Sequence, residues 1–314
     1  MSAERFKELG GQASQQFHDK SMQGIEYLAG TPQAKWLMKN SSSYLIEQGR
    51  QLFAYNGLDE AIGKTEPLLE SGHKLVILSS HKSHGEIAPA IHIMERFMAE
   101  SPELDEFVIP VAASMAGGQQ GNIIKTLYED ALVPNTKKRN IKTLPVVTDN
   151  DVKKRGMKLS KFGNGRTIHR PLTRKGTGFF IFIEGSVQGG RTNPETGTIF
   201  GLQKPDSMLQ QLLEYSKKSG VPLAFLTTGM VGTHKLFSAE GKFFTPEWIK
   251  AMAVNKFNRD ATFADVNIGS PISTNQLNLE DIPQAAENLM MILSSHLPYE
   301  ERGMYQGVEY LFNN

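Results

Sequence analysis

The chain has 314 residues, a formal net charge of +1 at pH 7 and no cysteine. This length is enough for one large α/β domain with an added subdomain. A charge near zero provides no overall field that would attract nucleic acid, and the lack of cysteine excludes disulfides, thiolate metal sites and a cysteine nucleophile.

The N-terminal part, residues 1–70, is expected to be helical. Apolar residues recur at helical spacing from Ala34 through Leu52, Phe53 and Leu58, and Gly72 then suits the C-terminal cap of a helix. The segment 1–20 is polar and charged, unlike a signal peptide, and no apolar stretch approaches the roughly 20 residues of a transmembrane helix. We therefore expect a cytoplasmic protein, which would meet a lipid substrate as a peripheral protein at the membrane or take it from a soluble carrier.

From residue 74 onward, short apolar runs alternate with helical patterns. The expected strands are Leu75–Leu78, Phe107–Ala112, Leu144–Thr148, Phe179–Ile183, Leu223–Thr227 and Phe263–Ile268. The expected helices are Ile87–Glu100, Asn122–Leu132, Asp206–Ser219 and Glu280–His296. This alternation predicts an α/β fold with a mainly parallel mixed sheet flanked by helices, in a domain of residues 71–314 that follows a helical N-terminal subdomain of residues 1–70. Residues 149–177 are rich in Lys, Arg, Gly and Thr and are expected as a long loop or two short basic helices over the sheet edge.

A histidine and a carboxylate follow the first of these strands. His81 comes just after the strand, and Glu86 lies five residues later, where the next helix should begin. The helix dipole favours a carboxylate at that position, and Pro89 suits the first turn. A carboxylate bonded to one ring nitrogen would fix the imidazole tautomer and leave the other nitrogen for general-base work. A structural role, with the histidine capping the helix and Glu86 as a first-turn charge, is the alternative.

His84 adds a second alternative for the same segment. Neutral imidazole and carboxylate are good Zn²⁺ ligands, so His81, His84 and Glu86 could together form a metal site. Their spacing differs from the pattern that places two histidines on one helical face. We therefore expect neither a metal nor another cofactor.

A glycine-rich segment follows the strand at Phe179–Ile183. Glu184, Gly185 and Ser186 open it, and Arg191 closes it. Glycines allow backbone N–H groups to point at an anion, and arginine offers a bidentate fork for phosphate. A glycine-rich turn with a solvated arginine is the alternative. If the two strands are neighbours in a parallel sheet, both polar segments meet at one edge, because ligands collect beyond the carboxyl ends of such strands.

At these segments the chain resembles the glycerolipid acyltransferases. Their first block, H-x4-D after a strand, is similar to Ser79–Glu86, with glutamate in place of aspartate. Their F-P-E-G-T-R block is similar to Phe182–Val187, where Val187 stands in place of arginine and Arg191 would substitute for it. The segment Gly189–Gly197 looks like part of the soluble plastid-type glycerol-3-phosphate acyltransferases. Val221–Phe225 and Asp265–Ile272 resemble later blocks, in family order.

The resemblance implies transfer of a fatty acyl group from a thioester, on coenzyme A or acyl carrier protein, to a hydroxyl of glycerol 3-phosphate. His81 would be the general base and Glu86 its orienting acid. Glu184, Gly185 and Ser186 would shape the acceptor pocket, while Arg191 would bind the acceptor's phosphate. The basic residues of a further block would be Lys153, Lys154 and Arg155, for which a solvated charge run is the alternative. The thioester and glycerol 3-phosphate are thus the expected partners.

Other functions stay open from the sequence. The same machinery could acylate a lysophospholipid or another hydroxyl acceptor. A metal-dependent hydrolase would use His81, His84 and Glu86, and would be inhibited by chelators. A lipid-binding or carrier-binding module with a degenerate site would bind acyl thioesters without turnover. An acyl-transfer assay separates these functions.

Overall fold

The structure is a computed structural model that describes residues 50–81, 86–113, 140–147, 165–183, 207–233 and 262–307, with residues 152, 202, 205 and 254 between them. Within this part, eight strands form one sheet in the order β1-β7-β6-β2-β5-β3-β4, and β8 pairs with β6. The strands are β1 (Phe53–Asn56), β2 (Lys74–Ser79), β3 (Glu106–Ala112), β4 (Ile141–Val146), β5 (Thr177–Phe182), β6 (Leu223–Val231), β7 (Ala264–Ile268) and β8 (Ile272–Ser273). The pairings are parallel except that β7 and β8 run antiparallel to β6. The expected α/β fold with a mainly parallel mixed sheet is confirmed.

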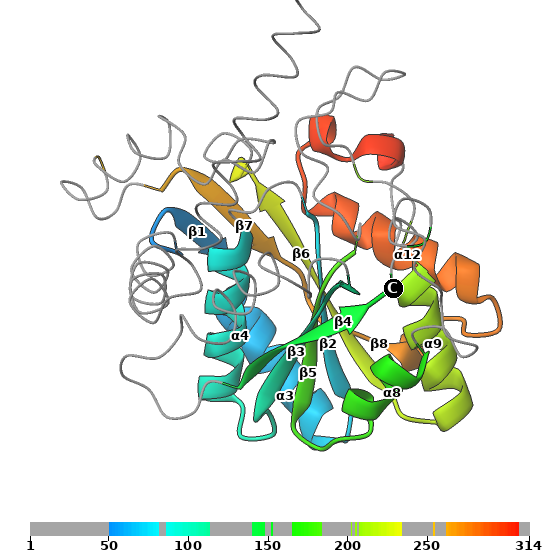
Figure 1. The fold of residues 1–314 in the computed structure, drawn as a ribbon. Helices are drawn as coiled ribbons and strands as arrows, with labels where there is room; N and C mark the ends of the chain where they lie inside the picture. Colours follow the sequence, from blue (N-terminus) through cyan, green and yellow to red (C-terminus); the bar gives the residue numbers. More distant parts are fainter. Residues whose placement is uncertain are drawn as a thin grey trace, which may run out of the picture.

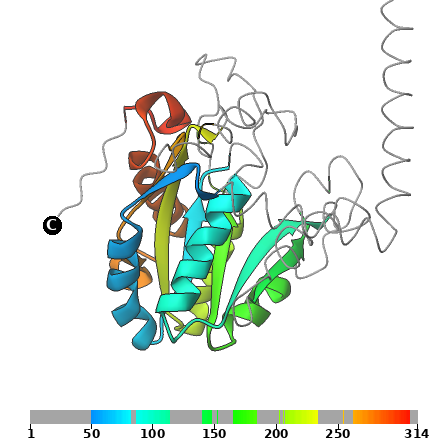
Figure 2. The same ribbon diagram turned by 90° about the vertical axis from the view of Figure 1, so that its left-hand side faces the viewer.

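Helices cover both faces of the sheet (Figure 1). On one face lie α3 (Leu58–Glu70) and α4 (Ile87–Glu100), which stand in front of the sheet in Figure 2. On the other face lie α8 (Gly165–Leu172), α9 (Ser207–Ser219) and α12 (Ile282–Ser295). One short 3₁₀ helix lies before α12, at Thr274–Gln276, and two lie after it, at Tyr299–Glu301 and Gly303–Tyr305.

The central strand β2 shows why the sequence folds this way. Leu75 and Ile77 pack into the core beneath α3 and α4, whereas Val76 and Leu78 pack into the core beneath α9 and α12. All four side chains are fully buried. A strand covered on both faces reads as an uninterrupted apolar run, and this is the pattern that predicted it.

Most of the expected elements lie close to where the sequence places them, and α4 coincides with its prediction. The edge strand β4 is an exception, because it spans Ile141–Val146 rather than Leu144–Thr148. Its side chains range from buried to exposed, as an edge strand permits, so its start carries no continuous apolar signal. The expected long loop or pair of short basic helices at residues 149–177 includes the helix α8 at Gly165–Leu172 and the start of β5.

The prediction of helix around Phe53 is wrong. Phe53–Asn56 form β1, which pairs with β7, and α3 packs against β2, β6 and β7. Gly57 separates the two elements with a φ of 83°, a left-handed conformation that few other residues adopt. Residues 53–70 therefore belong to the α/β layer structure, while residues 1–49 of the expected helical subdomain and the expected helix Asn122–Leu132 lie outside the described residues.

The helix end at Gly72 agrees with its prediction. α3 ends at Glu70, and Gly72 has a φ of 92° while its N–H donates to the carbonyl of Leu69. None of the described helices is both long and apolar enough to cross a membrane.

Candidate active site

Two neighbouring parallel strands, β2 and β5, end together at one edge of the sheet, beside β6, which runs further to Val231. Ser79, the last residue of β2, lies opposite Phe182 of β5 on one side and Thr228 of β6 on the other. Backbone hydrogen bonds continue the pairing past the strand end, because Ile183 N–H donates to Ser79 (3.0 Å) and Ser80 N–H donates to Thr228 (3.3 Å). The chain segments that leave β2 and β5 therefore start side by side, next to the last residues of β6, as expected for a ligand site of an α/β sheet.

His81 and Glu86 are in direct contact at this edge. The Nδ1 atom of His81 lies 2.9 Å from Oε2 of Glu86. The Glu86 side chain is fully buried, whereas the His81 side chain is 13% exposed. The pair therefore places a buried carboxylate behind an imidazole that solvent can reach, and the contact expected from the sequence is present.

Glu86 is the N-cap residue of α4 but forms no capping hydrogen bond with its side chain. Its second oxygen, Oε1, instead accepts a 2.7 Å hydrogen bond from the hydroxyl of Thr233, which is also fully buried. The carboxylate thus bridges the residue beyond β2 and the residue beyond β6. A role as a plain first-turn charge does not account for these two side-chain contacts.

An aromatic ring fixes the plane of the imidazole. His81 stacks on Phe182, the last residue of β5, with ring centroids 4.2 Å apart and an interplanar angle of 27°. Phe182 in turn meets Phe180 edge to face at 5.2 Å. Contacts from the end of β5 and from the start of α4 therefore hold the ring of His81 in its orientation.

A buried serine joins the strands under the histidine. The backbone N–H of Met230 donates to the hydroxyl of Ser80 at 3.1 Å, and Ser80 is fully buried. This bond ties β6 to the residue that precedes His81. Ser80 therefore supports the site structurally, and it is placed too deep to reach a substrate.

Sequence reasoning missed Thr233. The expected strand ended at Thr227, but β6 continues to Val231, so the polar residues that follow it come to the same edge as His81. The signal that could have found it is the apolar pair Met230 and Val231, which extends the strand past Thr227 toward the neighbouring site.

The other expected site residues lie outside the described residues. These are His84, Lys153, Lys154, Arg155, Glu184, Gly185, Ser186, Val187 and Arg191. Glu184 follows Ile183 directly, so the glycine-rich segment begins one residue beyond the backbone bond to Ser79. In the part of the chain that is described, no group of three or more His, Asp or Glu side chains is placed to hold a metal ion.

Two further histidines, His92 and His73, have structural roles. His92 packs its ring against Tyr55 with centroids 4.4 Å apart, and burial, followed by the charges of Arg50 and Arg96, lowers its pKa to about 4. His73 joins the start of β2 to Ser273, whose hydroxyl lies 2.8 Å from Nε2. His92 thus packs on Tyr55 and His73 contacts Ser273, whereas the ring of His81 is held by Glu86 and Phe182.

Comparison with protein-family models and with curated proteins finds no match to this chain.

Proposed function

We propose that the protein transfers a fatty acyl group from an acyl thioester, on acyl carrier protein or coenzyme A, to a hydroxyl of glycerol 3-phosphate, with His81 as the general base. The observation that carries this proposal is the 2.9 Å contact between the buried carboxylate of Glu86 and the partly exposed imidazole of His81. The resemblance of the polar segments after β2 and β5 to the glycerolipid acyltransferases indicates the substrates.

The geometry of the pair suits removal of a proton from an alcohol. With Nδ1–H donated to Glu86, the imidazole has one tautomer, and Nε2 is the nitrogen that exchanges a proton with a substrate. As the acceptor hydroxyl attacks the thioester carbonyl, its proton moves to Nε2 and the imidazolium is stabilised by Glu86. The carbon–sulfur bond then breaks, and the proton passes from Nε2 to the leaving thiolate. General-base assistance of this kind is worth about 10²–10⁴-fold in rate.

No nucleophile on the protein is required for this reaction. A thioester carbonyl is already electrophilic and its thiolate leaves readily, whereas the alcohol lacks acidity. A chain with no cysteine therefore keeps all the groups that the reaction needs.

The acceptor would lie over the segment that leaves β5. Glu184, Gly185 and Ser186 are assigned to its pocket and Arg191 to its phosphate, with Lys153, Lys154 or Arg155 as further cations. The contact between His81 and Phe182 supports this assignment, because it brings the end of β5 next to the imidazole. An arginine that binds the phosphate would align one hydroxyl with Nε2, which is a proximity effect.

The contacts of Glu86 favour an orienting role over metal binding. Both of its oxygens accept from protein donors, one from Thr233 and one from His81. A carboxylate held in this way keeps an imidazole in place rather than offering an oxygen to a cation. Acyl transfer is therefore preferred over the metal-dependent hydrolase that would use His81, His84 and Glu86.

An acyl-transfer assay tests the proposal. The purified chain is incubated with acyl-carrier and acyl-coenzyme A donors, each with glycerol 3-phosphate or with lysophosphatidate, in the presence and absence of EDTA. We expect an acylated glycerol 3-phosphate, at a rate that EDTA does not change. Product only from lysophosphatidate would move the assignment to the sibling reaction, and no product with any acceptor would contradict acyl transfer.

A further inference from the structure

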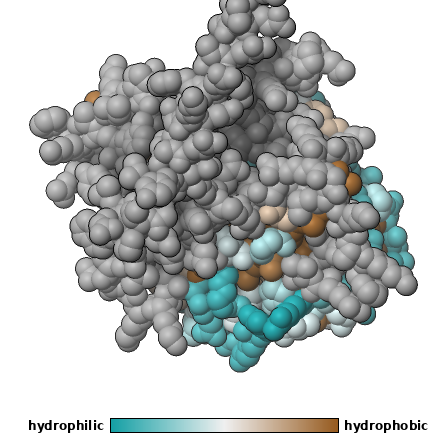
Figure 3. Space-filling view, in the orientation of Figure 1, coloured by the Kyte–Doolittle hydropathy of each residue, from teal (hydrophilic) through white to brown (hydrophobic). Residues whose placement is uncertain are grey.

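A groove lies at the edge of the sheet where α8 leaves β4 partly uncovered. It has a volume of about 480 Å³, within the range of small-molecule sites. Its lining combines apolar residues from both strands and the helix with basic residues around them: Val108, Lys142, Thr143, Leu144, Arg170, Pro171 and Arg174. The apolar surface over β3 and β4 is visible in brown at the lower centre of Figure 3, bordered by teal, hydrophilic surface.

The groove is separate from the candidate active site. Val108 and Lys142 are register partners, and Val108 is level with Phe179 of β5 and, through it, with Val76 of β2. His81 comes five residues after Val76, so the groove lies on the order of 20 Å from the imidazole at standard strand spacings. Val108 also belongs to the core under α9 and α12, whereas Phe182, on which His81 stacks, packs on the opposite face.

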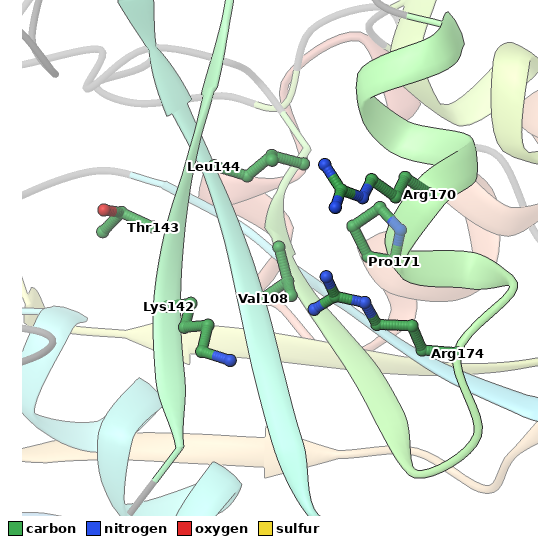
Figure 4. A pocket seen from close by; sticks show the side chains of 7 residues that line it. All are labelled: Val108, Lys142, Thr143, Leu144, Arg170, Pro171 and Arg174. Atoms are coloured by element: carbon green, nitrogen blue, oxygen red, sulfur yellow. The ribbon is translucent and has the colours of Figure 1, made fainter.

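The charges along the groove are unbalanced. Three of its described lining residues are cations and none is an acid. Arg170 and Arg174 extend from α8 and the turn after it toward β3 and β4, with Pro171 between them (Figure 4). Within the described part of the chain, the guanidinium of Arg170 takes part in no ion pair.

One carboxylate, Glu106, lies behind these cations. It accepts from Lys142 (2.6 Å), from Arg174 (3.4 Å) and from the hydroxyl of Thr177 (2.9 Å). It thereby holds Lys142 and Arg174 in place, but a single negative charge does not offset three positive ones.

Further positive charge lies beside Arg174. Lys74 donates to the carbonyl of Arg174, and the next residue, Lys175, pairs with Glu103 at 3.7 Å. Burial, and to a lesser extent the charge of Lys175, lowers the pKa of Lys74.

We propose that this groove binds an anionic amphiphile with a single aliphatic chain, whose phosphate or carboxylate head lies between Arg170 and Arg174 and whose chain lies along Val108, Leu144 and Pro171. Two guanidinium groups offer bidentate donors that match a phosphate or carboxylate. A small inorganic anion would leave the apolar part of the lining exposed, and a neutral lipid would leave the positive charge in excess of that of Glu106 unbalanced. A ligand with an anionic head group and an aliphatic chain would pair with the cations and also cover the apolar lining.

Binding of dodecyl phosphate to the full chain, measured by titration calorimetry below the micelle concentration, tests this site. Inorganic phosphate and dodecyl maltoside serve as the two comparison ligands, which separate the contributions of the anion and of the chain. We expect dodecyl phosphate to bind about tenfold or more tightly than either, because charge-assisted hydrogen bonds and apolar burial each contribute on this scale.

Single substitutions locate the binding. Arg170→Gln, which changes an exposed side chain, should weaken dodecyl phosphate binding about tenfold. Lys218→Gln, on the exposed side of α9, is the matched control and should leave the affinity unchanged. His81→Ala should also leave it unchanged, so that this site is judged independently of acyl transfer. Equal affinity for inorganic phosphate, no binding of dodecyl phosphate, or binding that Arg170→Gln does not weaken would each overturn the proposal.

Discussion

Thr233 and Glu86, 147 residues apart in the chain, meet through a 2.7 Å hydrogen bond between two fully buried side chains. This bond fixes one carboxylate oxygen while the other contacts His81. The orientation of the imidazole thus depends on a residue beyond β6, although His81 itself follows β2.

Removal of this hydroxyl tests its positioning role. Thr233→Val keeps the shape of the side chain but leaves a buried carboxylate oxygen without its donor, which costs about 1–3 kcal/mol. We expect kcat for acyl transfer to fall about tenfold with little change in KM, because the loss acts on the general base rather than on substrate binding. Steady-state kinetics measure this split.

Thr233→Ser is the control for that substitution. It retains the hydroxyl and should restore most of kcat. Equal activity of the valine variant and the original chain would show that Glu86 needs no support from β6.

The buried ring of His92 predicts a pH dependence of stability. Its folded pKa is about 4, below the ordinary value of 6.5, so the unfolded chain binds the proton more readily between these values. Stability is therefore unaffected above pH 6.5 and is lost as the pH falls from 6.5 toward 4. His92→Phe, which retains a ring against Tyr55, should make the free energy of unfolding less dependent on pH in this window.

Denaturant unfolding of both chains at several pH values measures this effect. The difference in the free energy of unfolding between the two chains should be constant above pH 6.5. Below pH 6.5 the original chain should lose stability relative to His92→Phe. Parallel curves over the whole range would contradict a neutral, buried His92.

The turn between β1 and α3 predicts a glycine requirement. Gly57 has a φ of 83°, and a Cβ atom there would lie 2.7 Å from the carbonyl oxygen of Ile268. Gly57→Ala should therefore destabilise the fold by about 1–2 kcal/mol or more. Thermal unfolding measures the loss.

Gly63, within α3, is the matched control. An added Cβ meets nothing within 4 Å, and its φ is not in the left-handed range. Gly63→Ala should stabilise the helix by about 0.5–1 kcal/mol. Similar effects of the two substitutions would contradict a specific constraint at Gly57.

The sequence predicted the centre of the fold better than its edges. β2 is buried on both faces and so carries a continuous apolar run, which identifies it without further information. β4 lies at an edge with mixed burial, and β1 has four residues of which only Phe53 is buried. Each of these two edge strands pairs with a strand that is distant in the chain, β1 with β7 and β4 with β3, and a local sequence pattern does not predict such a pairing.

The candidate site divides in the same way. The contact between His81 and Glu86 spans five residues across a strand end and a helix start, so chain spacing predicts it. The contacts to Phe182 and Thr233 depend on β5 and β6 lying on either side of β2. This strand order is a property of the whole sheet, and only the structure supplies it. The expected phosphate-binding residues after β5 remain predictions.

The central claim is that His81 removes the proton of the acceptor alcohol, and the rate of acyl transfer by His81→Ala tests it most directly. His169→Ala, an exposed histidine on α8, is the control. We predict that His81→Ala loses about 10²–10⁴-fold or more in kcat while its thermal unfolding matches that of the control. Turnover by a folded His81→Ala chain close to that of the original would contradict the account.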